Sequence, residues 1–373
     1  MNYSFWEKYF IESPADITII GAGIVGLSTA ISIKESRPDL DVKIIERSCS
    51  PNGASTKNAG FSCFGSVSEL LDDIDQNGES ACMEIVRMRW HGLKKLTARV
   101  TPLHLEYQLA GGTELFDKNN NVVQEHYADQ ISYLNQLMDD HLGIQTCYSI
   151  QPNKMLNAFH DKCIFNSHEG IINPVSMMNQ LYRIAVHAGI HILFGHNITE
   201  IDTKNHILTT ANQLKINYKH LIVCTNGFTQ RLLPDLDVYP ARNQVLITKP
   251  LKDNPLHSGY HFDKGYIYFR QYQGRILLGG GRNMDIAGET TDTFGHTAII
   301  QDYLTDILDR IYPGASGQIE CWWSGIMGVG PSKRPVTDWI DDYTLTGVRL
   351  GGMGVAIGSY LGDQLAEKIV QKL

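Results

Sequence analysis

Residues 16–46 read DITIIGAGIVGLSTAISIKESRPDLDVKIIE, and this stretch decides the fold. Residues 16–20 form a short, β-branched apolar run, which is typical of a buried parallel strand. Glycines follow, and apolar residues then recur at helical spacing as far as residue 35, until Pro38 ends the helix. Residues 41–46, DVKIIE, are expected to form a second strand. The sequence therefore predicts a strand–turn–helix–strand unit of the size of a βαβ motif.

The glycines between the first strand and the helix have separate structural reasons. Gly21 permits the tight turn, Gly23 lets the backbone approach a pyrophosphate, and Gly26 lets the helix pack closely on the strand. A pyrophosphate is stabilised at the positive N-terminus of a helix. Glu46 ends the second strand, where a carboxylate accepts a hydrogen bond from a ribose hydroxyl. The motif predicts a dinucleotide site but does not say which dinucleotide.

The segment 52–68 is poor in charge and rich in Gly, Ser, Thr and Asn, and we expect an irregular loop there. A loop of that length in a compact domain is usually functional. Within it, residues 53–60 read GASTKNAG, and their hydroxyls and backbone amides suit the phosphates and ring edge of a flavin. The same residues would also make an ordinary polar turn.

Periodicity predicts the remaining elements. Helices are expected at 84–99, 175–188, 293–312 and 357–371, and strands at 105–116, 189–194, 220–224, 244–248, 265–270, 275–279 and 344–350, with a turn at 119–123. Three of these strands, between 244 and 279, follow one another with short turns, which indicates an antiparallel sheet.

The fold class that follows is α/β, with a Rossmann-like dinucleotide domain and an interleaved antiparallel-sheet α+β domain. A chain of 373 residues is long enough for two domains. We assign 1–83, 145–227 and 321–373 to a discontinuous dinucleotide domain, and 84–144 and 228–320 to a substrate domain.

Composition excludes several other classes. A formal net charge of −8 without a basic run argues against nucleic-acid binding. The uncharged stretch 17–33 is short for a membrane helix and is interrupted by glycines, so no membrane span is expected. The start of the chain has no signal-peptide pattern. Seven cysteines without a Cys-x-x-Cys pair predict no metal site and fit reduced thiols in a cytoplasmic protein.

Five segments in order along the chain resemble the D-amino-acid oxidase superfamily, the group of glycine oxidase, sarcosine oxidase and D-amino-acid dehydrogenase. They are ASTKNAG at 54–60, EGIINP at 169–174, CTNG at 224–227, QVL at 244–246 and GGMG at 351–354. The resemblance spans roughly residues 16–370. The glycine fingerprint is shared with many families, whereas the ordered set is specific to this one.

The resemblance implies a glutathione-reductase type of FAD domain with FAD bound in an extended form. The residues that would contact the cofactor are Gly21, Ala22, Gly23, Ile24, Gly26, Glu46, Arg47, Ser55, Thr56, Asn58, Ala59, Gly60, Ile198, Thr225, Gly227, Gly325, Gly352, Met353, Gly354 and Val355. The last four precede a helix, whose N-terminal amides would favour the negative charge of reduced flavin. The implied reaction oxidises the C–N bond of a small-molecule amine or amino acid by hydride transfer to flavin N5.

One departure from the family pattern concerns the substrate. Relatives that use amino acids often carry Trp-Ala-Gly-Leu-Arg-Pro, whose arginine pairs with the substrate carboxylate, and here Met327 stands at that place. Methionine cannot form this bidentate pair. Arg270 is the first replacement candidate, followed by Lys333 and Arg334. We also expect Tyr268, with Tyr266 on the same strand face, to line a substrate pocket or to pack on the sheet.

Alternatives remain at this stage. The same fold could oxidise a 2-hydroxy acid or a polyol, and the missing arginine also leaves room for a catalytically silent flavoprotein. His261 is read as a surface histidine. Cys321 lies about four residues before the place where some relatives attach flavin, so non-covalent FAD is favoured, while Cys49 and Cys63 are read as packing residues.

Overall fold

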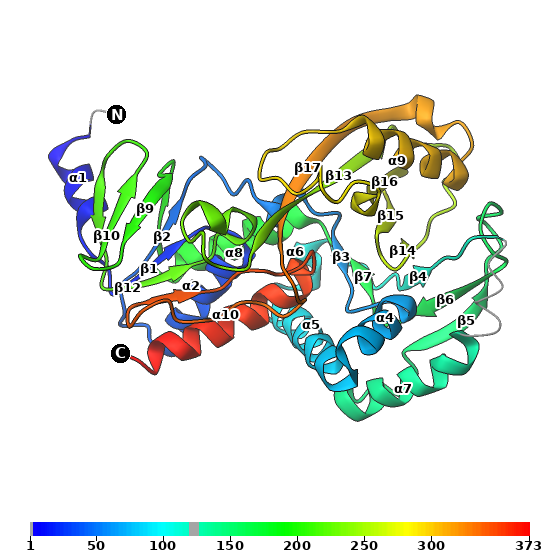
Figure 1. Ribbon diagram of the computed structural model, residues 1–373, viewed down its shortest axis with the longest axis horizontal. Helices are drawn as coiled ribbons and strands as arrows, with labels where there is room; N and C mark the ends of the chain where they lie inside the picture. The colour runs from blue at the N-terminus through cyan, green and yellow to red at the C-terminus, as the bar shows by residue number, and fades with distance from the viewer. Residues whose placement is uncertain (1–2, 119–126) are drawn as a thin grey trace.

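The computed structural model describes residues 3–118 and 127–373, which contain two large sheets lying side by side (Figure 1). The predicted turn at 119–123 lies outside the described residues. Within the described ranges, no helix has the length and apolar character needed to cross a membrane.

The first sheet has five parallel strands in the order β18-β12-β1-β2-β8. Their bounds are β1 (Ile17–Ile20), β2 (Val42–Glu46), β8 (His191–Phe194), β12 (His220–Val223) and β18 (Thr344–Thr346). Every residue of β1 and β2 is buried. Ile19 and Ile44 belong to one apolar cluster and Ile20 and Ile45 to another, so this sheet is covered on both faces, as parallel sheets require.

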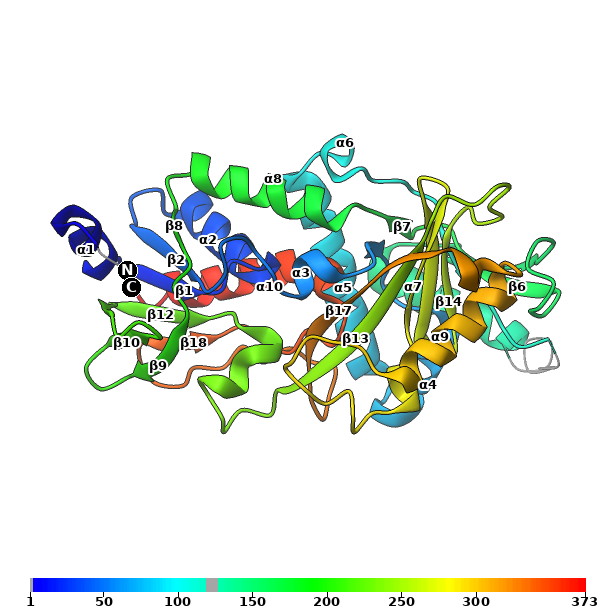
Figure 2. The same cartoon turned by 90° about the horizontal axis from the view of Figure 1, so that it is seen from above.

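Helices cover one face of this sheet, and Figure 2 shows three of them running beside one another. These three are α2 (Ile24–Ser36), α8 (Pro174–His187) and α10 (Gly354–Val370), and α5 (Glu79–Arg99) packs against α10. Small residues bring α10 onto α2, because a Cβ at Gly358 or Gly362 would lie within 2.8 Å of Ile24 or Ser28. The other face carries a three-stranded antiparallel sheet of β9 (Ile198–Asp202), β10 (Ile207–Thr210) and β11 (Lys215–Asn217).

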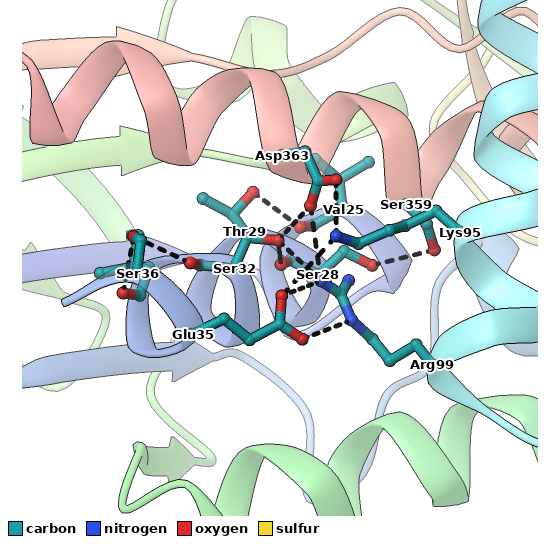
Figure 3. A network of polar contacts seen from close by, with 11 residues as sticks. Val25, Ser28, Thr29, Ser32, Glu35, Ser36, Lys95, Arg99, Ser359 and Asp363 are labelled. Atoms are coloured by element: carbon teal, nitrogen blue, oxygen red, sulfur yellow. Dashed lines mark hydrogen bonds and ion pairs between the residues drawn. The ribbon is translucent and has the colours of Figure 1, made fainter. Parts of the chain in front are cut away.

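Polar contacts join the three helices α2, α5 and α10 (Figure 3). Arg99 Nη2 lies 2.8 Å from Glu35 Oε2, and Lys95 Nζ lies 2.9 Å from Asp363 Oδ2. Ser32 also donates a hydrogen bond to Asp363. Because the Arg99 side chain is almost completely buried, these contacts hold the three helices in fixed relative positions.

The second sheet has eight strands in the order β17-β13-β16-β15-β14-β4-β6-β5. Their bounds are β4 (Gly112–Glu114), β5 (Tyr148–Pro152), β6 (Lys162–Asn166), β13 (Tyr239–Thr248), β14 (Gly259–Phe262), β15 (Ile267–Tyr272), β16 (Arg275–Gly280) and β17 (Ile319–Val329). All neighbours are antiparallel except the parallel pair β4–β14. Helix α9 (Ala298–Ile311) packs on one face through Ile300, Leu304 and Leu308.

Shorter elements connect these layers. They are α1 (Phe5–Glu12), α3 (Ala54–Lys57), α4 (Val67–Asn77), α6 (Pro102–Leu105), α7 (Ala128–Leu142), β3 (Phe61–Ser62), β7 (Gly170–Ile171) and the 3₁₀ turns η2 (Asn226–Arg231), η3 (Arg282–Met284) and η4 (Ala315–Gln318).

The α/β class with a parallel and a separate antiparallel sheet is confirmed, while several local predictions were wrong. The expected strand at 105–116 is reduced to β4, because Glu106 and Gly111 have positive φ angles of 51° and 76°, which interrupt an extended backbone. The expected loop at 52–68 contains α3 and β3. Strand β6 joins the large sheet by pairing with β4, and β5 pairs with β6 at the edge, although both strands fall in the segment 145–227. The domain boundaries stay a prediction.

Candidate active site

A cavity of about 640 Å³ lies between the two sheets. Its walls come from the turn before α2, the end of β2, α3 and the residues after it, the end of β12, β17 and the turn before α10; at the far end β14 and β15 contribute. A volume of this size is typical of a cofactor or ligand site.

The turn before α2 fits a pyrophosphate. Gly21 has a φ of +106°, and a Cβ there would lie 2.7 Å from the carbonyl oxygen of Cys224. The N-cap of α2 is Gly23, which has no side chain that could cap the helix. The Ile24 amide donates a hydrogen bond to Ser55 Oγ at 3.0 Å. The open helix N-terminus therefore faces the cavity through Gly21, Gly23 and Ile24. Gly26 lies outside the lining, where its missing Cβ admits the carbonyl of Gly21.

Glu46 is buried and lines the same end of the cavity. Its Oε2 accepts a hydrogen bond from the Ala22 amide at 2.9 Å and its Oε1 accepts one from the Ser48 amide at 3.1 Å. Each oxygen keeps a lone pair, so a ribose hydroxyl could still donate to this carboxylate. The guanidinium of the neighbouring Arg47 lies 3.6 Å from the centre of the Phe228 ring, and Arg47 also lines the cavity, as does Ile198.

The loop after β2 is held by the side chain of Asn58. Its Nδ2 donates to the carbonyl oxygens of Ala54 and Ser55, and its Oδ1 accepts from the Gly60 amide at 2.9 Å. Ser55, Asn58, Ala59 and Gly60 line the cavity. Thr56 does not line it, because its hydroxyl turns back to the carbonyls of Pro51 and Gly53.

The turn before α10 opens a second helix N-terminus toward the cavity. Gly351 and Gly352 have positive φ angles of 58° and 84°, and the N-cap Met353 makes no side-chain capping hydrogen bond. Asn226 Oδ1 accepts from the amides of Arg349 and Leu350 and so positions this turn. Of the remaining predicted residues, Thr225, Gly227, Gly325, Gly352, Met353, Gly354 and Val355 all line the cavity. Their contacts with FAD stay predictions.

The opposite end of the cavity is aromatic. Tyr268 and Tyr266 both line it, and the Tyr268 ring lies 5.7 Å from that of Phe61. Asn243 Nδ2 donates to the Tyr268 hydroxyl at 3.3 Å and to Met327 Sδ at 3.7 Å. Burial raises the pKa of Tyr268. Met327 therefore takes part in the cavity wall as a neutral, polarisable side chain.

The predicted carboxylate partner Arg270 does not line the cavity. Its guanidinium is buried behind Gly60, and Nη2 donates to the Ile172 carbonyl oxygen at 3.0 Å. Burial lowers the pKa of Arg270 to about 10. The loop of residues 58–60 covers this part of β15, and that long-range packing cannot be read from the strand pattern.

Three cations line the aromatic end instead, and they differ in their partners. Lys333 lies 3.0 Å from Glu69 and 2.8 Å from Asp73, and Lys264 pairs with Asp72. Arg282 makes no ion pair with any described residue, and its buried Nε has no hydrogen-bond partner there. Arg334 pairs with Glu84 outside the cavity.

Sequence reasoning missed Arg282, Asn243 and His261 as cavity residues. Arg282 follows three consecutive glycines, which was the available signal. His261 was expected on the surface and is instead buried beside Glu169, with 3.3 Å between Nε2 and Oε2. Cys63 is buried and lines the cavity, whereas Cys49 and Cys321 are exposed.

The model of the D-amino-acid oxidase (DAO) family, described as FAD-dependent oxidoreductases, matches residues 16–368. The chain belongs to this family. The protein is therefore an FAD-dependent oxidoreductase, and the helix N-termini, Glu46 and the Asn58 loop described above supply donors and acceptors that suit the cofactor.

One curated relative and two solved structures resemble the chain over nearly its whole length. The probable oxidoreductase OrdL of Rhizobium meliloti is 24% identical over 395 residues, which cover 100% of this chain and 89% of OrdL. L-Proline dehydrogenase from P. horikoshii has a TM-score of 0.74 at 15% identity, covering 96% of this chain and 94% of its own. L-α-Glycerophosphate oxidase from Mycoplasma pneumoniae, solved with FAD bound, has a TM-score of 0.72 at 14% identity, covering 96% and 95%. At these identities the two structures show a shared fold.

Proposed function

We propose that this protein oxidises the C–N bond of an amine or amino acid. The observation that carries the proposal is the combination, at one end of the cavity, of an aromatic wall and a cation without an ion pair. The rings of Phe61 and Tyr268 offer π-faces to an ammonium group, and Arg282 offers its guanidinium to a carboxylate. This pair of features suits a ligand that carries both charges.

The remaining residues would divide into cofactor and substrate groups. FAD, when bound, accepts the hydride that leaves the substrate carbon. The N-terminus of α2 and Glu46 would hold the nucleotide half, and the N-terminus of α10 would favour negative charge at the flavin end. Tyr268, held by Asn243, would fix the substrate against the cavity wall. The name of L-proline dehydrogenase among structures with this fold is consistent with such a substrate.

The test mixes the FAD-loaded protein with candidate substrates without oxygen and follows the flavin absorbance. The amine arm uses L-proline, pyrrolidine, glycine and benzylamine, so that substrates with and without a carboxylate are compared. The alcohol arm uses L-lactate, glycerol and glycerol 3-phosphate. We expect bleaching in the amine arm only, followed by recovery of an imine or carbonyl product.

Two results would contradict the proposal. Bleaching by an alcohol alone would replace the amine with a hydroxylated substrate in the same cavity. A stable oxidised spectrum with every compound, in protein that contains one FAD per chain and is reduced by dithionite, would assign the fold to a catalytically silent flavoprotein.

A further inference from the structure

His261 lies in the wall of the cavity, next to the aromatic residues. It is on β14, opposite Tyr268 of β15 in the strand register, and its ring centre lies 5.1 Å from that of Phe61. The side chain is 12% exposed and lines the cavity. A ligand that contacts Phe61 and Tyr268 would therefore lie beside this imidazole.

Glu169 fixes the ring from the side away from solvent. Its Oε2 lies 3.3 Å from His261 Nε2, and its Oε1 accepts hydrogen bonds from the amides of Phe64 at 3.2 Å and Gly65 at 3.4 Å. The carboxylate is thereby held by the backbone that follows the cofactor loop. Within the described residues Nδ1 of His261 has no hydrogen bond, so this nitrogen is the one that remains available to a ligand.

The groups around His261 are mostly acidic. Glu114, its register neighbour on β4, is buried and accepts hydrogen bonds from Ser66 and Ser68. A small cavity of about 10 Å³, the size of about one water molecule, is lined by Glu114, Glu169 and His261. Glu69 on α4 contributes a further negative charge that Arg89 and Lys333 already pair, and the Cys63 thiol lies within 4.8 Å of the Glu169–His261 pair.

This arrangement makes the imidazole a stronger base than a free histidine. Burial by itself would lower the pKa of His261, but the hydrogen bond and charge of Glu169, with Glu114 and Glu69 farther away, raise it above 6.5. Burial raises the pKa of the Cys63 thiol well above its usual value, so that thiol stays protonated and does not compete. The chemistry of the cavity wall is therefore that of an acid–base pair.

We propose that His261 accepts the ammonium proton of the amine substrate, with Glu169 as the residue that positions it; this rests on the function proposed above. An alkylammonium ion has a pKa of about 10, near that of lysine, and holds no free electron pair at neutral pH. One N–H bond of the substrate breaks and its proton passes to Nδ1, while the electron pair of that bond stays on the substrate nitrogen. The neutral amine can then support loss of hydride from the adjacent carbon.

The test compares wild type with H261Q, E169Q and the control H257Q, which changes an exposed histidine outside the cavity. FAD content and far-ultraviolet circular dichroism verify folding of each variant. The rate of anaerobic bleaching by the fastest amine of the panel above is measured from pH 6 to pH 10. Independently, ¹⁵N-histidine NMR titration of the FAD-loaded wild type and E169Q follows the imidazole signal that is missing from H261Q.

In wild type and H257Q we expect the rate to rise with pH through an inflection above 6.5. H261Q should lose at least 100-fold at pH 7, a typical contribution of a general base, and recover most of the rate at pH 10, where about half of the amine is already neutral. E169Q should move the inflection and the NMR pKa of His261 to lower pH. A loss of the H261Q bleaching rate at pH 7 that largely disappears at pH 10 indicates proton acceptance, because a purely structural defect would lower the rate at both pH values.

An H261Q profile parallel to that of wild type, or an NMR pKa of His261 that E169Q leaves unchanged, would overturn the proton acceptor while leaving amine oxidation standing. If no amine bleaches the wild type, the proposed function fails, and the proton acceptor fails with it. If H261Q does not fold, the pH profile of E169Q still decides the role of the pair, because loss of the carboxylate should move the inflection to lower pH and an unmoved inflection would overturn the proposal.

Discussion

The Glu46 carboxylate accepts a hydrogen bond from the backbone amide of Ala22 at 2.9 Å, which ties the end of β2 to the turn that begins α2. The second carboxylate oxygen accepts a hydrogen bond from the Ser48 amide. The Glu46 side chain therefore holds both the turn before α2 and the backbone after β2. A residue predicted to contact ribose therefore also shapes the turn that would receive the pyrophosphate.

E46Q should weaken FAD binding by about tenfold or more. Glutamine offers one acceptor and one donor, so its NH₂ group would face a backbone N–H, and hydrogen bonds to a charged group contribute about 1.5–3 kcal/mol. The measurement is the dissociation constant of FAD for reconstituted apoprotein, followed by quenching of flavin fluorescence. The control E35Q changes a carboxylate on α2 outside the cavity and should bind FAD as wild type does. Equal affinities for E46Q and E35Q would contradict the role given to Glu46.

A substitution at Gly26 tests whether the close packing of α2 on the preceding turn requires a glycine there. A Cβ there would lie 2.0 Å from the carbonyl oxygen of Gly21, and backbone on both sides cannot yield without moving α2. We expect G26A to lower both the melting temperature and the FAD content of the purified protein, by several degrees and to well under one FAD per chain. The control G317A introduces a methyl group into open space in η4 and should change neither value. A fully loaded, wild-type-like G26A would show that the helix does not need this close approach.

The parts that could be predicted from the sequence are those set by local geometry. Gly26 is required by the nearby backbone of Gly21. Apolar runs predicted the five strands of the parallel sheet and β13, β15 and β16 of the other sheet, but not β5, β6, β14 or β17. Arg270 and Arg282 show where this fails. Both are arginines near the same β-ribbon, yet the loop at Gly60 covers Arg270, whereas Arg282 comes after the strand and reaches the cavity. The pattern of apolar residues in a strand does not show that a segment about 200 residues earlier in the sequence buries the Arg270 side chain.

His261 and Glu169 make the same point for charge. Each lies in a segment whose sequence offers no obvious partner, and the parallel pairing of β4 with β14 brings their surroundings together. Parallel pairing of a three-residue strand is a tertiary outcome, because β4 is too short to specify its neighbour by periodicity alone. At the substrate end, Tyr266, Tyr268, Met327 and Lys333 were named from the sequence and line the cavity, whereas the Glu169–His261 pair was not foreseen.

Acid should destabilise the protein partly through Glu69. Burial would raise its pKa, but Arg89 and Lys333 lower it from 4.5 to about 2, which corresponds to about 3 kcal/mol of stabilisation. Because the folded-state pKa is depressed, this stabilisation is present above pH 4.5 and is lost as the pH falls toward 2. Thermal melts should thus fall more steeply between pH 5 and pH 3 for wild type than for E69Q, which starts lower at pH 7 because Arg89 loses its partner.

Burial raises the pKa of the neighbouring Asp73, whereas the pKa of Glu69 is lowered. Because the charge of Glu69 also contributes to raising the pKa of Asp73, the comparison of Glu69 with E69Q is repeated in a D73N background. E84Q, which changes an acid paired with Arg334 outside the cavity, serves as the control and should follow the wild-type pH dependence. Parallel curves for wild type and E69Q would mean that Glu69 carries no linked stability.

Arg282 should select ligands that carry a carboxylate. Of the three cations at the aromatic end of the cavity, it is the one without an ion pair to a described residue, so R282M should raise the dissociation constant of L-proline by about tenfold or more, as expected for loss of charge-assisted hydrogen bonds of about 1.5–3 kcal/mol. Pyrrolidine has the same ring and amine without the carboxylate, and its affinity should stay unchanged. Anaerobic stopped-flow measures the bleaching rate against the concentration of each ligand, and half-saturation of that rate gives the dissociation constant. R334M, which alters an arginine outside the cavity, should match wild type. An equal loss of affinity for L-proline and pyrrolidine in R282M would mean that Arg282 stabilises the cavity wall and does not contact the ligand. The carboxylate would then have to bind Lys264 or Lys333, which would break their ion pairs with Asp72 and Glu69.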